Sequence, residues 1–282
     1  MAQIPAKVAA RLQLGIKQFQ PILASAKTRD VNESDTVMIV TDMLSAVFGY
    51  DKYSEITSEC CIRGTFCDLG IKIDGAFQYL LEVKAIGLEL KEPHIKQAVD
   101  YAANQGTDWV ILTNAETWRI YKVTFAKPID KELVLEFSFS PLNSKKLSDI
   151  ELLYHLTREG LVKSALGEFH AQRQALSRFF LGAMVCSDPV LEVVRRELRR
   201  LSPDVKIDLE EIRSALMQDV LKREVVEGEK AEEARKKISR VAGRILRAKS
   251  AKAEKQTEEM QPISNDVSAE PVGATGSVTE IH

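Results

Sequence analysis

Apolar residues recur every three or four positions in the first part of the chain. Residues 4–23 follow this spacing and residues 33–48 repeat it, so the pattern predicts two amphipathic helices. Asn32 or Asp30 precedes the second stretch and is suited to cap it, and Gly49 is a natural stop. The chain is therefore expected to begin with two helices that each bury one face.

The spacing then changes to a period of two, which is typical of strands. Asp74-Gly75 lies between two of the alternating stretches and predicts a tight hairpin turn, and a helix over residues 94–104 follows Pro93. The predicted strands cover residues 56–62, 67–73, 77–86, 109–113, 118–123 and 133–139. This order predicts the α/β class, with helices flanking a mixed sheet.

From Ser148 onward the pattern is helical as far as residue 249. The predicted helices cover residues 148–159, 164–184, 188–201, 208–225 and 229–248. Residues 250–282 have almost no large apolar side chains, so we expect them to be disordered. The chain thus divides into an N-terminal helix (1–29), an α/β domain (30–147), an α-helical C-terminal region (148–249) and a disordered tail (250–282).

The composition is that of a globular protein, and we expect it to be cytoplasmic. The 282 residues are 45% hydrophobic, with 39 Lys+Arg against 41 Asp+Glu, and no apolar run is long enough to span a membrane. Lys7 and Arg11 are not followed by a continuous apolar stretch, so neither a secretory signal nor a membrane partner is expected. The four cysteines form no Cys-x-x-Cys pair, so neither a zinc site nor a disulfide framework is predicted.

The strand predicted after the hairpin turn carries two charges among apolar residues. Glu82 and Lys84 point to one face of this strand, while Leu81 and Val83 point to the other. Two charges in an apolar strand are costly unless they bind a metal, a substrate or each other. Asp68 lies on the strand that the hairpin folds back against this one, so its carboxylate can approach Glu82.

Two converging carboxylates and a lysine suit a hard divalent cation such as Mg²⁺. Such a cation polarises a phosphate oxygen, and the lysine can position an attacking water or stabilise charge on the phosphate. On the following helix, Gln97 and Tyr101 are four residues apart and share a face. A Glu-x-Lys triplet by itself is also found in an edge strand with a simple salt bridge, and this is the alternative interpretation.

Asp68, Glu82-Val83-Lys84 and Gln97-x-x-x-Tyr101 together resemble the PD-(D/E)XK nuclease pattern. More closely, the chain looks like the N-terminal nuclease domain of type I restriction enzyme R subunits, over about residues 30–125. Four further segments support this: Glu33-Ser34-Asp35-Thr36, Phe48-Gly49-Tyr50-Asp51, Leu81-Glu82-Val83-Lys84-Ala85, and Val110-Ile111-Leu112-Thr113-Asn114 leading to Trp118-Arg119-Ile120-Tyr121. The resemblance implies a restriction-endonuclease-like fold over residues 30–147 and a Mg²⁺-dependent DNA endonuclease, which hydrolyses phosphodiester bonds.

The same resemblance implies roles for the charged residues. Asp68 and Glu82 would be metal ligands, and the Val83 carbonyl would add a third oxygen. Lys84 would be the catalytic lysine. The cation would be Mg²⁺, with Mn²⁺ as an alternative, and the substrate would be DNA.

Three further residues take supporting roles by the resemblance. Gln97 and Tyr101 would support the site or contact the DNA backbone. Glu33 matches an acidic residue that faces the metal site in many PD-(D/E)XK enzymes. Glu33 can equally be a helix-start residue that the helix dipole favours.

The chain departs from the R subunits in one large respect. It contains no G-x-x-x-x-G-K-[ST] phosphate loop, so we expect no ATP site and no translocase motor. It is therefore similar to stand-alone proteins with the restriction-type domain, and other restriction or defence proteins are candidate partners. A non-catalytic DNA- or protein-binding module with the same fold is the main alternative, and an RNA or repair nuclease is a third hypothesis. The intact Asp68, Glu82 and Lys84 favour catalysis.

The last predicted helix has a basic side. Arg240, Arg244 and Arg247 lie there, opposite an apolar stripe that includes Ile238 and Val241. We expect this region to form an intramolecular or homodimeric helical unit whose basic face binds the phosphate backbone of DNA. A solvated helix surface is the alternative.

Overall fold

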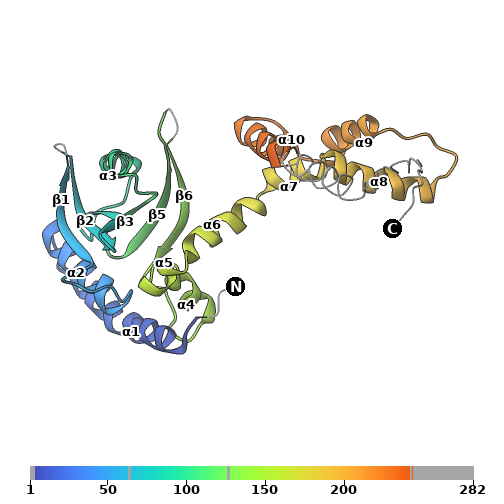
Figure 1. Ribbon diagram of the computed structural model, residues 1–282. Helices are drawn as coiled ribbons and strands as arrows, with labels where there is room; N and C mark the ends of the chain where they lie inside the picture. Colours follow the sequence, from blue (N-terminus) through green and yellow to red (C-terminus); the bar gives the residue numbers. More distant parts are fainter. Residues whose placement is uncertain (1–3, 63–64, 126–127, 242, 244–282) are drawn as a thin grey trace, which may run out of the picture. The chain divides into compact units, whose positions relative to one another are not determined.

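The computed structural model describes residues 4–62, 65–125, 128–241 and 243 (Figure 1). The chain forms two compact units, Met1–Arg173 and Gln174–His282. The predicted N-terminal helix, the sheet and the first helices after the sheet all lie in the first unit. The predicted tail (250–282), Arg244 and Arg247 lie outside the described residues.

The first unit contains a six-stranded sheet with helices around it. Its strands are β1 (Ile56–Ile62), β2 (Thr65–Ile73), β3 (Ala76–Val83), β4 (Trp109–Thr113), β5 (Thr117–Thr124) and β6 (Asp130–Ser138). Its helices are α1 (Ala6–Thr28), α2 (Glu33–Ala46), α3 (Glu92–Gln105), α4 (Leu147–Tyr154), α5 (Arg158–Val162) and most of α6 (Ala165–Ala175). The predicted α/β class and mixed sheet are therefore confirmed.

The strands lie side by side in chain order, from β1 to β6. Every neighbouring pair is antiparallel except β3 and β4, which are parallel because α3 carries the chain back across the sheet between them. The predicted turn joins β2 to β3, and Asp74 and Gly75 both have positive φ, 52° and 80°. That conformation matches the twist of a two-residue hairpin.

Apolar side chains form two clusters, one on each face of the sheet. α1 and α2 cover one face and α3 covers the other (Figure 1). Leu81 and Val83 belong to the cluster with α1 and α2, whereas Leu80 belongs to the cluster with α3. The period of two in β3 thus separates its side chains between the faces, as predicted from the sequence.

Several predicted boundaries were wrong. β3 ends at Val83 rather than at residue 86, because the chain leaves the sheet after Lys84. The helix predicted over 148–159 is two helices, since the side chain of Thr157 caps α5 by accepting the Gly160 amide at 3.0 Å. The helix predicted over 164–184 is also divided, because Ser177 caps a new helix. Local capping by Ser and Thr therefore overrode continuous apolar spacing.

The second unit is helical in its described part. It contains α7 (Arg178–Val185), α8 (Asp188–Leu201), α9 (Leu209–Ala215), a π-helical turn η1 (Leu216–Val220), α10 (Arg223–Val226) and a helix over residues 229–241. α8 agrees with its prediction, whereas the helix predicted over 208–225 is interrupted at η1. Across the described residues of both units, no helix is both long and apolar enough to cross a bilayer.

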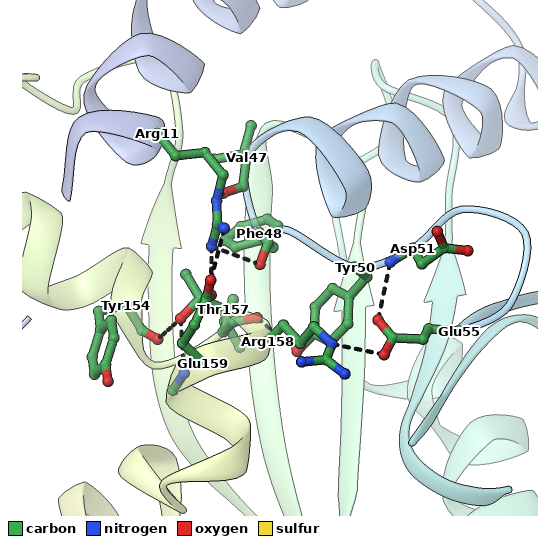
Figure 2. A network of polar contacts seen from close by, with 12 residues as sticks. Arg11, Val47, Phe48, Tyr50, Asp51, Glu55, Tyr154, Thr157, Arg158 and Glu159 are labelled. Atoms are coloured by element: carbon green, nitrogen blue, oxygen red, sulfur yellow. Dashed lines mark hydrogen bonds and ion pairs between the residues drawn. The ribbon is translucent and has the colours of Figure 1, made fainter. Parts of the chain in front are cut away.

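A polar network holds α1, α5 and the loop after α2 together (Figure 2). The Arg11 guanidinium donates Nη1 to Glu159 Oε1 at 2.9 Å and Nη2 to Glu159 Oε2 at 2.6 Å. It also donates to the carbonyls of Val47 and Phe48, at 3.0 and 3.2 Å. A partly buried guanidinium with four such acceptors fixes the helix ends around it.

We predict that Arg11→Ala lowers the free energy of unfolding of the first unit by about 2–3 kcal/mol, because two carbonyls and a carboxylate lose a charged donor. Lys17→Ala, an exposed change on the same helix, should alter it by less than about 0.5 kcal/mol. The measurement is urea unfolding followed by tryptophan fluorescence, since both tryptophans, Trp109 and Trp118, lie in this unit. Equal effects of the two variants would contradict a stabilising role for the network.

Candidate active site

A register shift in the β2–β3 hairpin sets the position of Asp68. Near the turn, Lys72 of β2 pairs with Phe77 of β3. The next residue of β2, Ile71, pairs with Tyr79, so Gln78 of β3 has no partner on β2 and forms a bulge. This bulge moves the pairing by one residue, and Leu69 therefore lies opposite Leu81. Because one residue of shift exchanges the faces, Asp68 lies on the face of Glu82 and not on that of Leu81.

Asp68 also closes the end of this strand pair. The Val83 backbone amide donates to Asp68 Oδ2 at 2.7 Å, beyond the last backbone pair at Leu69 and Leu81. A carboxylate oxygen thus takes the place of a backbone carbonyl where β3 ends. The bond fixes the carboxylate next to the two residues that flank Val83, which are Glu82 and Lys84.

Glu82 and Lys84 form an ion pair at the end of β3. Lys84 Nζ lies 2.8 Å from Glu82 Oε1, and their side chains are only 17% and 8% exposed. The predicted alternation of this strand therefore holds, with Leu81 and Val83 in the core on the opposite face. The backbone of Lys84 continues the parallel ladder for one more bond, from its amide to the Thr113 carbonyl at 2.8 Å.

Glu33 reaches the same cluster from the start of α2. Its Oε2 lies 3.3 Å from Lys84 Nζ, and its side chain is 48% exposed. Asn32 caps this helix, with its side-chain oxygen accepting the Asp35 amide at 2.9 Å. The structure therefore brings Glu33, Asp68, Glu82 and Lys84 together, from α2, β2 and the end of β3.

Burial raises the pKa of the Asp68 and Glu82 carboxyls. For Asp68 the desolvation outweighs the hydrogen bond from Val83 and the charge of Lys84, which lower the pKa. For Glu82 burial is again the largest cause, and the charges of Asp68 and Glu33 raise the pKa further against the effect of Lys84. Ionisation of the two carboxyls is therefore disfavoured, because the positive charge of Lys84 does not compensate for burial and for the neighbouring negative charges.

The lysine responds in the opposite sense. Burial acts to lower the Lys84 pKa, but the hydrogen bond with Glu82 and the charges of Glu82, Glu33 and Asp68 outweigh it and raise the pKa above its ordinary value. Lys84 is therefore a permanent cation at neutral pH. It is suited to hydrogen-bond donation and charge stabilisation rather than to removing a proton.

Gln97 and Tyr101 lie on α3, which packs against β2, β3 and β4. Tyr101 is 1% exposed and belongs to the apolar cluster under α3, with its ring edge-on to Phe77 at 6.5 Å between centroids. Gln97 is exposed. The two residues that the sequence placed on one helix face thus have different surroundings.

The donor set fits a divalent cation that keeps part of its water shell. Within the described residues, no group of three or more His, Cys, Asp or Glu side chains is arranged to hold a metal. A cation here would rely on the carboxylates of Asp68 and Glu82, which is the number of protein ligands that Mg²⁺ commonly takes. Two neighbouring carboxyls whose pKa is raised are stabilised in their ionised form by such a charge.

Two residues at this site carried no role from the sequence. Thr36 is fully buried, and its hydroxyl oxygen accepts the Ile86 amide at 3.1 Å. Asn114, 7% exposed, donates its side-chain amide to the carbonyls of Ile86 and Leu88 at 3.3 and 2.9 Å. Both residues lie in segments that support the family resemblance, but only the tertiary structure shows that they bind the backbone of Ile86 and Leu88.

The predicted basic face of the last helix is described only in part. Arg240 is exposed on the helix over residues 229–241, while Arg244 and Arg247 lie beyond the described residues. The proposed contact of these arginines with DNA stays a prediction. Comparison of the chain with models of known protein families, with curated proteins and with solved structures finds no match in any of the three.

The Asp68 carboxylate combines a structural hydrogen bond with a negative charge, and two variants separate these. Asp68→Ala removes the acceptor of the Val83 amide, whereas Asp68→Asn keeps an oxygen there and removes only the charge. We predict that Asp68→Ala unfolds at lower urea in EDTA, with a free energy of unfolding about 1–2 kcal/mol below that of Asp68→Asn. Equal stability of the two variants would show that the hydrogen bond does not hold the strands together.

Magnesium stabilisation should depend on pH. In the metal-free protein, the raised pKa of Asp68 and Glu82 makes folding less favourable as the pH rises through the folded-state values, because the folded chain holds these protons more tightly. Protonated carboxyls do not bind a cation, so the rise in Tm on adding Mg²⁺ should grow as the pH increases from about 5 to about 8. The measurement is thermal unfolding with Mg²⁺ and with EDTA. An equal increase in Tm at both pH values would show that Mg²⁺ binds elsewhere. The same conclusion would follow if an Asp68→Asn/Glu82→Gln variant gained as much in Tm as the wild type.

Proposed function

We propose that the chain is a Mg²⁺-dependent DNA endonuclease of the restriction-endonuclease-like kind, with its active site at Asp68, Glu82 and Lys84. The observation that carries the proposal is the convergence of these three side chains at the end of β3, where a bulge and a side-chain-to-backbone bond position them. The order α2, β1, β2, β3, α3, β4 around this point supports the proposed fold.

Each residue takes a role that follows from its surroundings. Asp68 and Glu82 would hold the cation, which supplies electrostatic stabilisation of the charge that develops on the phosphate. Lys84, kept protonated by its carboxylate neighbours, would donate a hydrogen bond to a phosphate oxygen or orient the attacking water. The water oxygen would bond to phosphorus and give a proton to solvent, while the bond from phosphorus to the leaving sugar oxygen breaks and that oxygen takes up a proton from solvent.

Glu33 would act on the lysine. It is about half exposed and lies 3.3 Å from Lys84 Nζ, so it competes with Glu82 for the same ammonium. A cation between Asp68 and Glu82 would reduce the hold of Glu82 on Lys84, and Glu33 would then keep the ammonium in place. This role is compatible with its position at the start of α2, where the helix dipole also favours a carboxylate.

A second candidate function is a non-catalytic DNA- or protein-binding module with the same fold. The observation that favours it is that Lys84 is ion-paired with both Glu33 and Glu82, as in a structural ion-pair cluster. This alternative needs no cation and no turnover. A single assay of DNA cleavage therefore distinguishes the two candidate functions.

The assay is incubation of the purified chain with supercoiled, linear and single-stranded DNA, and with RNA, in Mg²⁺, in Mn²⁺ and in EDTA. We predict cleavage that EDTA abolishes, and a loss of about a hundredfold or more in rate for Lys84→Met, since a lost charge-stabilising donor typically costs this much. Lys122→Met is the matched control, because Lys122 lies on β5 over the Trp109 ring. Equal rates for Lys84→Met and Lys122→Met would reject the active site, and cleavage of RNA alone would change the substrate.

A further inference from the structure

The chain between β3 and α3 is ordered without helix or strand. After Lys84 it passes through Ala85 to Lys91, with a turn and a bend at residues 86–88. Its polar backbone groups are bound by side chains from other elements. The Ile86 amide is bound by Thr36, the Ile86 and Leu88 carbonyls by Asn114, and the Leu90 carbonyl by Arg119 at 2.7 Å.

Thr36 supplies the contact nearest to the candidate site. Its side chain is fully buried on α2, and its Oγ1 donates to the Asn32 carbonyl at 2.8 Å while accepting the Ile86 amide at 3.1 Å. One hydroxyl therefore joins the capped first turn of α2 to the chain two residues after Lys84. A valine of the same shape would leave the Ile86 amide without this acceptor.

The position of this bond along α2 connects it to the charges. Thr36 and Glu33 are three residues apart on the helix and so lie on the same side of it. Lys84 and Ile86 are two residues apart on the other chain. The Thr36–Ile86 bond thus runs beside the Glu33–Lys84 ion pair and fixes the distance between the two elements that carry it.

The rest of this segment leaves little space for adjustment. The Lys84 backbone amide is held by its hydrogen bond to the Thr113 carbonyl, and the Ile86 side chain is 2% exposed in the core. A Cβ atom on Gly87 would collide with the Asp30 carboxylate, so the backbone there passes close to the side chain of a residue in the loop before α2. The hydrogen bond from Ile86 to Thr36 is therefore the contact that ties this otherwise firmly held segment to α2, and its loss would loosen the chain next to Lys84.

We propose that Thr36 is a positioning residue, which acts through Ile86 to hold the Lys84 ammonium between Glu82 and Glu33. Its effect on catalysis rests on the proposed nuclease function, whereas its effect on Lys84 does not. The residue acts on the lysine without touching the reacting atoms.

Three variants isolate the hydroxyl. Thr36→Val keeps the shape and removes the hydrogen bonds, and Thr36→Ser keeps a hydroxyl at the same place. Thr41→Val is the matched control, because Thr41 lies on the same helix and bonds the Val37 carbonyl at 2.8 Å, four residues back, as Thr36 bonds Asn32. Thermal unfolding by circular dichroism selects conditions in which every variant is folded, and Thr36→Ser carries the test if Thr36→Val does not fold.

The first measurement is the rate at which an amine-reactive reagent acetylates Lys84, followed by mass spectrometry. In the wild type the side chain is 17% exposed and ion-paired, so the reaction should be slow. We expect Thr36→Val to speed it by about tenfold, through local opening of the segment. Thr36→Ser and Thr41→Val should stay close to the wild type. The proposal is overturned if Lys84 is acetylated at the same rate in Thr36→Val as in Thr41→Val. If Thr36→Val does not fold, the proposal is overturned by acetylation of Lys84 in Thr36→Ser that is far faster than in the wild type.

The second measurement is DNA cleavage with the same variants. Thr36→Val should lower kcat by about ten- to a hundredfold with little change in KM, since a misplaced catalytic group affects the transition state more than substrate binding. Thr36→Ser should restore most of kcat. If the wild type does not cleave DNA but Lys84 is still acetylated faster in Thr36→Val, the nuclease function is rejected and the positioning role of Thr36 is kept. Released Lys84 with unchanged kcat would overturn the link from Thr36 to catalysis.

Discussion

The register shift at Gln78 is the constraint on which the candidate site depends. Without it, the turn at Asp74-Gly75 would pair Asp68 with Leu81 and direct the carboxylate toward the core under α1 and α2. The bulge places Leu69 opposite Leu81 instead, so Asp68 lies on the face of Glu82. Bulges are frequent next to active sites because they redirect a single side chain. Here the redirected carboxylate also takes over the last hydrogen bond of the strand pair, from the Val83 amide.

The charges at the end of β3 do not stabilise the fold by themselves. Taking ions out of water costs several kcal/mol each, and the attraction within a largely buried ion pair does not always offset this cost. Glu82 is 8% exposed at its side chain, and burial together with the charges of Asp68 and Glu33 raises its pKa in spite of Lys84, so its ionised form is disfavoured there. The apolar side chains around it offset this cost, since each large buried one contributes roughly 1.5–3 kcal/mol. A cluster kept at a cost to stability is more consistent with a site than with a structural ion pair.

The sequence predicted the parts of this arrangement that depend on local pattern. The period of two placed Glu82 and Lys84 together and Leu81 and Val83 in the core, and the Asp-Gly turn correctly joined β2 to β3. The resemblance to restriction-type nucleases suggested Glu33, which the structure brings to Lys84. The sequence could not show the bulge, because no residue in the strand differs in pattern from an ordinary one.

Other features needed the tertiary structure for a physical reason. Thr36 and Asn114 bind backbone groups of a segment 26 to 50 residues away in the chain, and no local spacing encodes such partners. Tyr101 was expected on a face shared with Gln97, but its ring is drawn into the core under α3 while Gln97 is exposed. Continuous apolar spacing suggested longer helices, whereas the side chains of Thr157 and Ser177 cap new ones.

The position of a bound cation tests the proposed active site at Asp68, Glu82 and Lys84 most directly. Crystals of the chain grown or soaked with Mn²⁺, which replaces Mg²⁺ and scatters anomalously, would show where the ion binds. We predict an anomalous peak between the carboxylates of Asp68 and Glu82, with Lys84 still beside Glu33, and no such peak in crystals of Asp68→Asn. A well-ordered site with both carboxylates in place and no ion between them, at a Mn²⁺ concentration that supports binding elsewhere on the chain, would contradict it.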